Sequence, residues 1–238
     1  DPKRLKNIPV MYLYATSDGS MWLGYRSVLA KYDTNGQLVK EYPIRNEHGG
    51  ASISGFCESR NHEIIISVWN GRVYHLDKEK DEFIPYPDKM RSRNPTVMVQ
   101  DNEQDYFWLA TWGDGVVRFD PSAPGDSMFV YSEIPVNAAG EEDGLILSLA
   151  QDDKLGYIWL TTGHDFMALQ IQPDRTLKQL KFPAGLLPVN HMLVEVLKGK
   201  ECLWVSAFDR PSFILHLMDN ITKDYALPAL ADRVNRSP

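Results

Sequence analysis

The sequence predicts an all-β fold built from five consecutive four-stranded repeats, and three observations lead to this prediction. One short pattern, a polar turn followed by a Trp or Ile between apolar residues and then a small residue, occurs five times. Its central residues, called anchors below, are Trp22, Ile65, Trp108, Trp159 and Trp204, which are 43, 43, 51 and 45 residues apart. The flanking segments alternate apolar and polar residues and are bounded by Gly, Asp, Asn and Pro, as strands are. A period of about 40 to 50 residues in a strand-only pattern is typical of a β-propeller, in which each repeat is one blade.

The expected order of the four strands is the same in every repeat. The first strand is expected at 10–15, 52–57, 96–100, 145–150 and 192–197, and the second carries the anchor. The third is expected at 28–32, 73–76, 116–119, 167–171 and 213–217, and the shorter fourth at 39–42, 82–86, 128–131, 177–182 and 223–225. The blades then cover approximately 10–45, 52–90, 95–135, 144–183 and 191–226 of one domain, 1–238. They form either a closed five-bladed ring or part of a larger ring of seven or eight blades.

Burial follows from the same pattern. Runs such as Ile64–Ile66 lack polar alternation, which indicates strands packed on both faces. The anchor tryptophans are therefore expected in the core between blades. The longer third spacing is expected to fall in two loops, at 121–126 and 135–144, and the acidic run Glu141–Asp143 in the second could hold calcium, although three adjacent acids are more often a solvated loop.

Composition narrows the class of partner. The 238 residues are 43% hydrophobic and carry a net charge of -7, which argues against a nucleic-acid partner. No run approaches the roughly 18 apolar residues that span a bilayer, so no membrane contact by this chain is expected. Cys57 and Cys202 fall in different blades, too far apart for a disulfide, and are expected to be small buried residues.

The repeat resembles the propeller repeats of two-component regulators. The third repeat carries the likeness best, in Val97–Asp101 and Phe107–Pro121, and the first fits in Trp22–Gly24 and Lys31–Asp33. The second departs at Ile65 and the fifth loses its Gly turn to Asp209–Pro211, and the likeness extends over 10–226.

That resemblance implies a biological setting. Such repeats usually build the periplasmic sensor region of hybrid two-component system histidine kinases, many of them from gut bacteria that detect polysaccharide breakdown products. It implies a non-enzymatic sensor on the periplasmic or extracellular side of a bacterial membrane. Its partners would be an oligosaccharide or other small molecule and the remaining propeller and signalling modules of a parent protein, and a homodimer is left open.

Candidate ligand-binding residues lie in the turns between second and third strands and in the connections between blades, which propeller architecture places on one face. They combine aromatic rings with polar and charged groups: Arg26, Trp69, Asn70, Arg91, Arg93, Trp112, Asp114, His164, Asp165, Phe208 and Arg210. Indole planes cover the apolar face of a sugar ring while polar groups take its hydroxyls, so these residues favour a carbohydrate. Arg91 and Arg93 could recognise acidic groups on a glycan, or could simply be solvated or pair with acids such as Asp88. In the alternative, the turn aromatics fold back onto the next blade.

Signals for catalysis are weak. His191 and Glu195 share a strand face without a third ligand at metal spacing, and no nucleophile motif or phosphate-binding Gly loop occurs. We therefore expect no catalytic residue, metal or cofactor. The alternatives are a propeller enzyme, such as a streptogramin-type lyase or a glycan hydrolase, and a protein-interaction propeller. An enzyme would have to draw on a small set of side chains: His48, His164, His191, Glu47 and Glu141.

Overall fold

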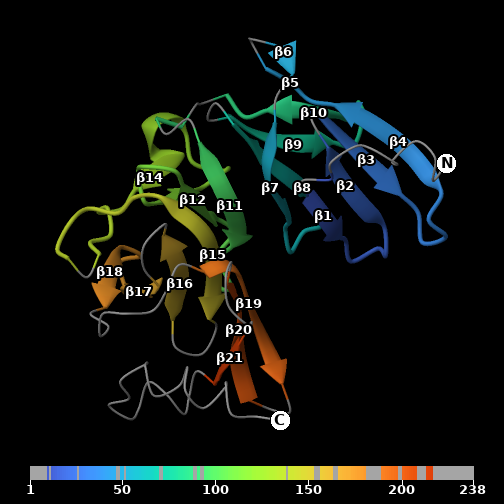
Figure 1. Ribbon diagram of the computed structural model, residues 1–238. Coiled ribbons are helices and arrows are strands. Elements are labelled where there is room, and N and C mark those ends of the chain that lie inside the picture. Colours follow the sequence, from blue (N-terminus) through green and yellow to red (C-terminus); the bar gives the residue numbers. More distant parts are fainter. Residues whose placement is uncertain are drawn as a thin grey trace. The chain divides into compact units, whose positions relative to one another are not determined.

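The described part of the chain is all-β. The computed structural model describes residues 10–216 apart from 11, 26, 47–48, 51, 70–71, 88–89, 92–93, 138, 153–155, 163–165, 181–188, 198–199 and 208–212, with side chains up to residue 180 except 46, 49 and 50. Its strands form four sheets of four, one sheet of three and one short hairpin (Figure 1). In each four-stranded sheet the strands are antiparallel and follow one another in chain order. Within these residues the only helix is one 3-10 turn, η1 (Gly125–Ser127).

The strands have the following bounds. The first sheet contains β1 (Tyr12–Ala15), β2 (Met21–Tyr25), β3 (Val28–Tyr32) and β4 (Leu38–Pro43), and β5 (Arg45–Asn46) and β6 (Gly49–Gly50) form the hairpin. The second contains β7 (Ile53–Glu58), β8 (Ile64–Val68), β9 (Arg72–Asp77) and β10 (Glu82–Pro85). The third contains β11 (Pro95–Gln100), β12 (Phe107–Thr111), β13 (Val116–Phe119) and β14 (Phe129–Tyr131). The fourth contains β15 (Ile146–Asp152), β16 (Tyr157–Thr162), β17 (Phe166–Ile171) and β18 (Leu177–Leu180), and the fifth β19 (Val189–Leu197), β20 (Lys200–Ala207) and β21 (Phe213–His216).

These bounds confirm the strand order predicted for the first four repeats, with shifts of one or two residues at most ends. In the fifth repeat three of the four predicted strands are present, and the fourth, at 223–225, lies outside the described residues. The hairpin of β5 and β6 was not predicted, because two-residue strands carry no periodic signal. Its position is in the connection from the first sheet to the second.

The chain divides into two compact units. One comprises residues 1–109 and 119–130, and the other residues 110–118 and 131–238, so the third sheet supplies strands to both. In the first unit the leading strands β1, β7 and β11 are neighbours, β1 beside β7 and β7 beside β11. In the second unit β15 lies beside β19 in the same way. Leading strands of successive sheets placed next to one another are typical of propeller blades.

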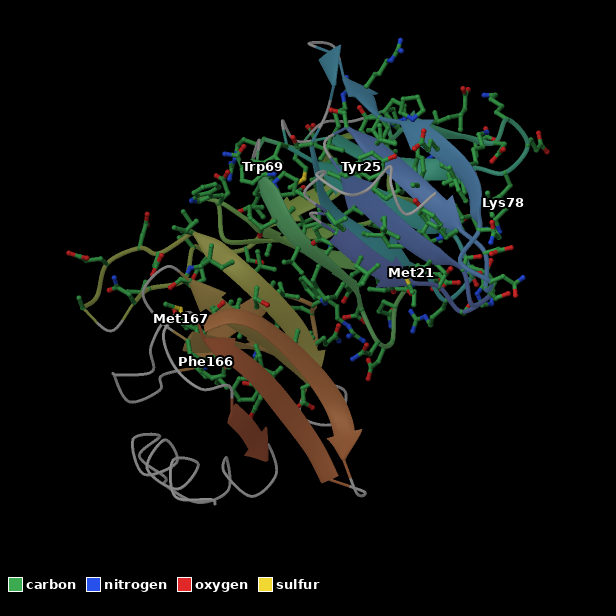
Figure 2. The ribbon with its side chains drawn as sticks, turned by 45° about the vertical axis from the view of Figure 1, so that its right-hand side comes forward. Met21, Tyr25, Trp69, Lys78, Phe166 and Met167 are labelled. Atoms are coloured by element: carbon green, nitrogen blue, oxygen red, sulfur yellow. The ribbon has the colours of Figure 1, made fainter. Side chains whose placement is uncertain are left out.

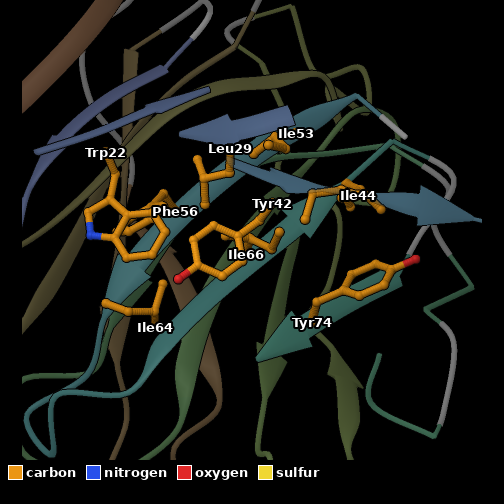
Figure 3. Close-up of a cluster of buried hydrophobic side chains, with 10 residues drawn as sticks. Trp22, Leu29, Tyr42, Ile44, Ile53, Phe56, Ile64, Ile66 and Tyr74 are labelled. Carbon is orange, nitrogen blue, oxygen red and sulfur yellow. The ribbon is translucent and has the colours of Figure 1, made fainter. Parts of the chain in front are cut away.

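The core of the first unit fills the space between its first two sheets (Figure 3). Trp22 is 1% exposed and its ring centre lies 5.5 Å from that of Tyr42 and 5.7 Å from that of Phe56. The anchors Ile65, Trp108 and Trp159 are also at most 1% exposed. The prediction that anchors are core residues is therefore confirmed for four of the five repeats, and the side chain of Trp204 lies outside the described ones.

A polar residue closes the turn before each of the first three anchors. The backbone N–H groups of Thr16, Ser59 and Asp101 donate to the carbonyl oxygen two positions before the anchor, at 2.9, 2.8 and 3.0 Å. Asp101 does more than the other two, because its Oδ2 also accepts the indole N–H of Trp108 at 2.8 Å. Its Oδ1 accepts the N–H groups of Glu103 and Gln104 at 3.0 and 2.9 Å, so one carboxylate fixes both the turn and the anchor.

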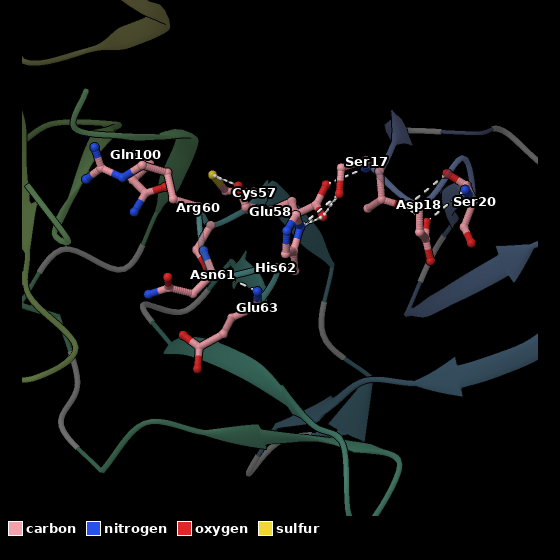
Figure 4. Close-up of polar contacts among 12 residues, drawn as sticks. Ser17, Asp18, Ser20, Cys57, Glu58, Arg60, Asn61, His62, Glu63 and Gln100 are labelled. Carbon is pink, nitrogen blue, oxygen red and sulfur yellow. Dashed lines mark hydrogen bonds and ion pairs between the residues drawn. The ribbon is translucent and has the colours of Figure 1, made fainter. Parts of the chain in front are cut away.

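Polar side chains join successive repeats of the first unit at the end of the strands opposite the candidate ligand-binding turns. Ser17 donates from its N–H and hydroxyl to the carboxylate of Glu58 at 2.7 and 2.6 Å, and His62 Nδ1 lies 3.0 Å from Glu58 Oε1 (Figure 4). The guanidinium of Arg60 donates hydrogen bonds to the backbone carbonyl oxygens of Asn102 and Gln104 in the next repeat. These contacts hold neighbouring turns at a separation of one repeat.

The first prediction concerns this Glu58 contact. Burial raises the pKa of Glu58, but hydrogen bonds from Ser17 and His62 outweigh it and hold the pKa below the ordinary value of 4.5. A lowered folded-state pKa gives stability that is present above the unfolded-state pKa and is lost as pH falls through the folded-state value. We expect Glu58→Gln to lower the free energy of unfolding by about 0.2 to 1 kcal/mol at pH 7, because its partner His62 is 68% exposed and solvent screens the contact. The difference from the parent chain should narrow progressively as pH falls below 4.5 through the folded-state pKa.

Urea denaturation at pH 7 and near pH 3 would measure it, with Glu63→Gln as the control. Glu63 is an exposed carboxylate in the same turn. An equal loss for Glu58→Gln at both pH values would contradict a contribution from the ionised carboxylate.

Cys57 lies on β7 and Cys202 on β20, in different sheets as predicted. Cys57 is a free, buried thiol, and burial raises its pKa to about 11. The thiol therefore stays protonated at neutral pH, in agreement with its role as a small buried residue.

Candidate functional site

In the first three repeats, hydrogen bonds show that the turn between the second and third strands lies at the same end of the sheet as a connection between sheets. Ile44 N–H donates to the carbonyl of Ser27 at 2.7 Å in the first repeat, and Trp69 N–H donates to the carbonyl of Ser52 at 2.9 Å in the second. Figure 2 shows Trp69 and Tyr25 at this end of the first unit, away from Met21 and Lys78. In the third repeat Gly113 N–H donates to the carbonyl of Gly144 at 2.8 Å.

In the first unit two of the candidate residues are described. Trp69 follows β8 directly and is half-buried, so part of its indole contributes to packing and part reaches the surface. Arg91 is exposed in the connection to the third sheet. Arg26, Asn70 and Arg93 lie outside the described residues.

In the second unit the turn after β12 carries Trp112 and Asp114. The side chain of Trp112 is 50% exposed, which is unusual for a large apolar residue in the described part of the chain. Asp114 is half-buried. His164, Asp165, Phe208 and Arg210 lie outside the described residues. Because the two turns belong to different units, Trp69 and Trp112 are separate candidates.

Hydrogen bonds from the backbone and from the Thr111 hydroxyl fix the turn that carries Trp112. Thr111 donates from its N–H and its hydroxyl to the carbonyl of Gly115 at 3.0 and 2.7 Å, and its hydroxyl accepts the Asp114 N–H at 3.1 Å. Gly113 and Gly115 have φ of +124° and +70°, values that residues with a side chain rarely adopt. The sequence Trp-Gly-Asp-Gly therefore allows a tight turn that carries both an indole and a carboxylate.

The connection before β15 supports this turn from the other side. Trp112 pairs with Leu145 in an isolated bridge, and Gly144 accepts the Gly113 N–H. A Cβ on Gly144 would lie 2.3 Å from the carbonyl oxygen of Gly113, so the approach needs glycine at this position. Sequence reasoning assigned Gly144 only to a loop, because no local pattern reveals a contact across 31 positions.

Asp143 corrects the expectation of a solvated acidic loop. It is 5% exposed, accepts the hydroxyl of buried Thr162 at 2.6 Å and donates its N–H to the carbonyl of Pro135 at 2.7 Å. Glu141 and Glu142 are exposed, as expected of a solvated loop. Asp143 is therefore a structural residue that ties the connection to β16, and the region where side chains are described contains no cluster of three or more potential metal ligands.

Comparisons with known proteins show a fold and no family. No protein family model matches the chain, and no curated protein matches it in sequence. Solved structures match in three dimensions. The virginiamycin B lyase from Staphylococcus aureus is 18% identical with a TM-score of 0.62, over 84% of this chain and 64% of that one. The extracellular domain of the putative hybrid two component system BT3049 from B. thetaiotaomicron is 21% identical with a TM-score of 0.59, over 82% of this chain and 26% of that one.

The Dos1 propeller matches with a TM-score of 0.62 and 11% identity, over 90% of this chain and 56% of that one. These likenesses support the propeller fold, and their low identity carries no activity across. The chain spans less than two thirds of the length of each of the three. Among described residues no helix is long and apolar enough to cross a membrane.

Proposed function

We propose that the chain is a non-enzymatic sensor propeller of a two-component signalling protein, on the periplasmic or extracellular side of a bacterial membrane, and that it binds an oligosaccharide. The observation that carries the proposal is Trp112, a half-exposed indole on a turn held by backbone and side-chain hydrogen bonds. A fixed indole binds a sugar ring without first paying the entropy of ordering a loop. Asp114, on the same turn, supplies a carboxylate that can accept hydrogen bonds from sugar hydroxyls.

The likeness to the BT3049 extracellular domain supports the sensor setting, in which further modules of a parent protein would pass the signal on. The second candidate function is a propeller enzyme, which the likeness to virginiamycin B lyase favours. Incubation with a streptogramin B antibiotic and with glycans separates the two, because the sensor leaves them intact. If the chain converts one of these compounds, and His164→Ala or His191→Ala abolishes the turnover, the chain is an enzyme and the sensor proposal fails.

The second prediction tests Trp112 directly. Stacking that removes ~50 to 100 Å² of apolar surface from water contributes roughly 1 to 2.5 kcal/mol. We expect Trp112→Ala to weaken glycan binding by about 1 to 3 kcal/mol, that is roughly 5-fold to 150-fold. The melting temperature should change by only a few degrees, because half of the side chain is exposed.

Calorimetric titration with neutral and acidic glycans measures the affinity, with Val130→Ala as the control. Val130 is an apolar side chain that is 39% exposed on β14, outside the candidate turns. If no glycan binds the parent chain, or if Trp112→Ala binds as tightly as Val130→Ala, the oligosaccharide proposal fails.

A further inference from the structure

Two segments of the second unit carry its exposed apolar side chains. Trp112 is 50% exposed on the turn after β12, and Val136 is 39% exposed on the connection between β14 and β15 (Figure 1). The turn and the connection touch where the Gly113 N–H donates to the carbonyl of Gly144 at 2.8 Å. Among the large apolar side chains described in this unit, only these two are so exposed.

Hydrogen bonds give the connection a fixed shape. Gln179 on β18 accepts the N–H of Val136 with its Oε1 at 2.7 Å and donates from its Nε2 to the carbonyl of Val136 at 2.6 Å. The N–H of Asn137 donates to the carbonyl of Glu141 at 2.8 Å, and Asn137 Oδ1 accepts the Glu141 N–H at 2.9 Å. Val136 also pairs with Glu142 in an isolated bridge. The side chains of the connection therefore start from fixed backbone positions.

The ionisable side chains described on these two segments are all carboxylates. Asp114 lies on the turn, and Glu133, Glu141 and Glu142 are exposed on the connection. These four residues are here called the acidic rim. Asp143 is not counted with them, because it is buried and accepts a hydrogen bond inside the unit.

The cations described in the second unit lie elsewhere. Arg118 lies within β13, and Arg175 and Lys178 lie in or next to the turn between β17 and β18. That turn is at the opposite end of the fourth sheet from Thr162, the residue that the connection contacts through Asp143. Within the described part of this unit, the indole is thus accompanied by negative charge only.

This combination has a definite chemical preference. The face of an indole attracts a cation through its ring quadrupole, and Trp does so better than Tyr or Phe. Carboxylates attract the same cation and repel an anion. In low salt, one carboxylate about 10 Å from one ammonium changes affinity by about 2-fold, so four change it on the order of 10-fold.

We propose that the Trp112 turn and the acidic rim bind an oligosaccharide of amino sugars with free, protonated amines, and that they reject sugars with carboxylate or sulfate groups. This inference rests on the proposed function, because it names the class of oligosaccharide that the Trp112 site takes. The ammonium lies against the indole and among the carboxylates, and the apolar face of the sugar ring covers the rest of the exposed indole.

Calorimetric titration at low salt tests the preference with matched ligands. Hexasaccharides of glucose, mannose and galactose are each used in three forms: the neutral sugar, the 2-amino sugar and the uronic acid. The measurement is made at about pH 6, where a sugar amine is protonated. We expect the amino form to bind on the order of 10-fold more tightly than the neutral form, and the uronic acid on the order of 10-fold more weakly.

Two further measurements assign the preference to the acidic rim. The combined variant Glu133→Gln, Glu141→Gln, Glu142→Gln leaves only Asp114 and should reduce the preference for the amino form to about 2-fold. Asp174→Asn is the control, because it removes an exposed carboxylate of the same unit from the turn between β17 and β18, and it should keep the full preference. Salt of about 1 M, where the Debye length is ~3 Å, should reduce the preference in the parent chain without any substitution.

The outcomes distinguish this inference from the proposed function. If no hexasaccharide binds in any form, the oligosaccharide proposal fails and this inference fails with it. If neutral forms bind and amino forms bind no more tightly, only this inference fails. Tighter binding of the uronic acids would show that arginines of the candidate set govern the ligand. An equal loss of preference in Asp174→Asn would show an effect of net charge without a role of the acidic rim.

Discussion

Trp108→Ala is expected to lower the free energy of unfolding by about 3 to 5 kcal/mol, the usual cost of removing a buried aromatic side chain. Trp108 is 1% exposed on β12, and its ring centre lies 5.2 Å from that of Tyr106 in an edge contact. Truncation leaves a cavity and also removes the N–H donor that Asp101 Oδ2 accepts at 2.8 Å. Denaturant unfolding monitored by circular dichroism measures the loss.

Two variants separate packing from hydrogen bonding at this site. Trp108→Phe keeps much of the ring volume and removes the N–H donor, so we expect a smaller loss than for alanine, about 1 to 3 kcal/mol. Trp112→Ala removes an indole that is 50% exposed, and should lower stability by less than about 1 kcal/mol. Similar losses for Trp108→Ala and Trp112→Ala would contradict the division into core anchor and surface indole.

The repeats could be predicted from the sequence because burial of a large aromatic residue at a constant spacing leaves a direct trace in the chain. Trp22, Trp108 and Trp159 all lie in the core, and Ile65 takes the same position with a smaller side chain. Strand ends followed from the Gly, Asp and Asn residues that bound them. The Asp that follows the first strand of the third repeat also has a physical reason, since its carboxylate accepts the hydrogen bond of the anchor indole.

The exposure of the turn aromatics could not be predicted. Trp69 and Trp112 occupy the same place in their repeats. The side chain of Trp69 is nevertheless less exposed than that of Trp112, which is 50% exposed. The difference depends on which residues pack around each turn, and those come from segments distant in sequence. Asp143 shows the same limit, because its burial depends on Thr162 in another strand.

Gly144→Ala is expected to disturb the Trp112 turn from a distance in sequence. The added Cβ would lie 2.3 Å from the carbonyl oxygen and 2.7 Å from the carbonyl carbon of Gly113, and 3.2 Å from Ile134 Cγ2. Backbone atoms cannot rotate away as a flexible side chain can, so the two segments must separate. The Gly113 N–H bond to the Gly144 carbonyl at 2.8 Å should then be lost. Overpacking of this kind costs typically about 1 to 3 kcal/mol of stability.

The consequence for function is that Gly144→Ala should weaken glycan binding as much as Trp112→Ala does, although residue 144 carries no group that a sugar would contact. Gly140→Ala is the control, because it lies in the same connection with φ of +86° and has no atom within 4 Å of an added Cβ. It should cost stability through backbone strain, roughly 1 kcal/mol, and leave binding unchanged. Amide hydrogen exchange of Gly113 provides the decisive readout, since its protection should fall in Gly144→Ala and persist in Gly140→Ala. If Gly113 stays protected in Gly144→Ala while glycan binding is lost, the connection before β15 does not act by positioning the Trp112 indole. The evidence for Trp112 then comes from Trp112→Ala alone.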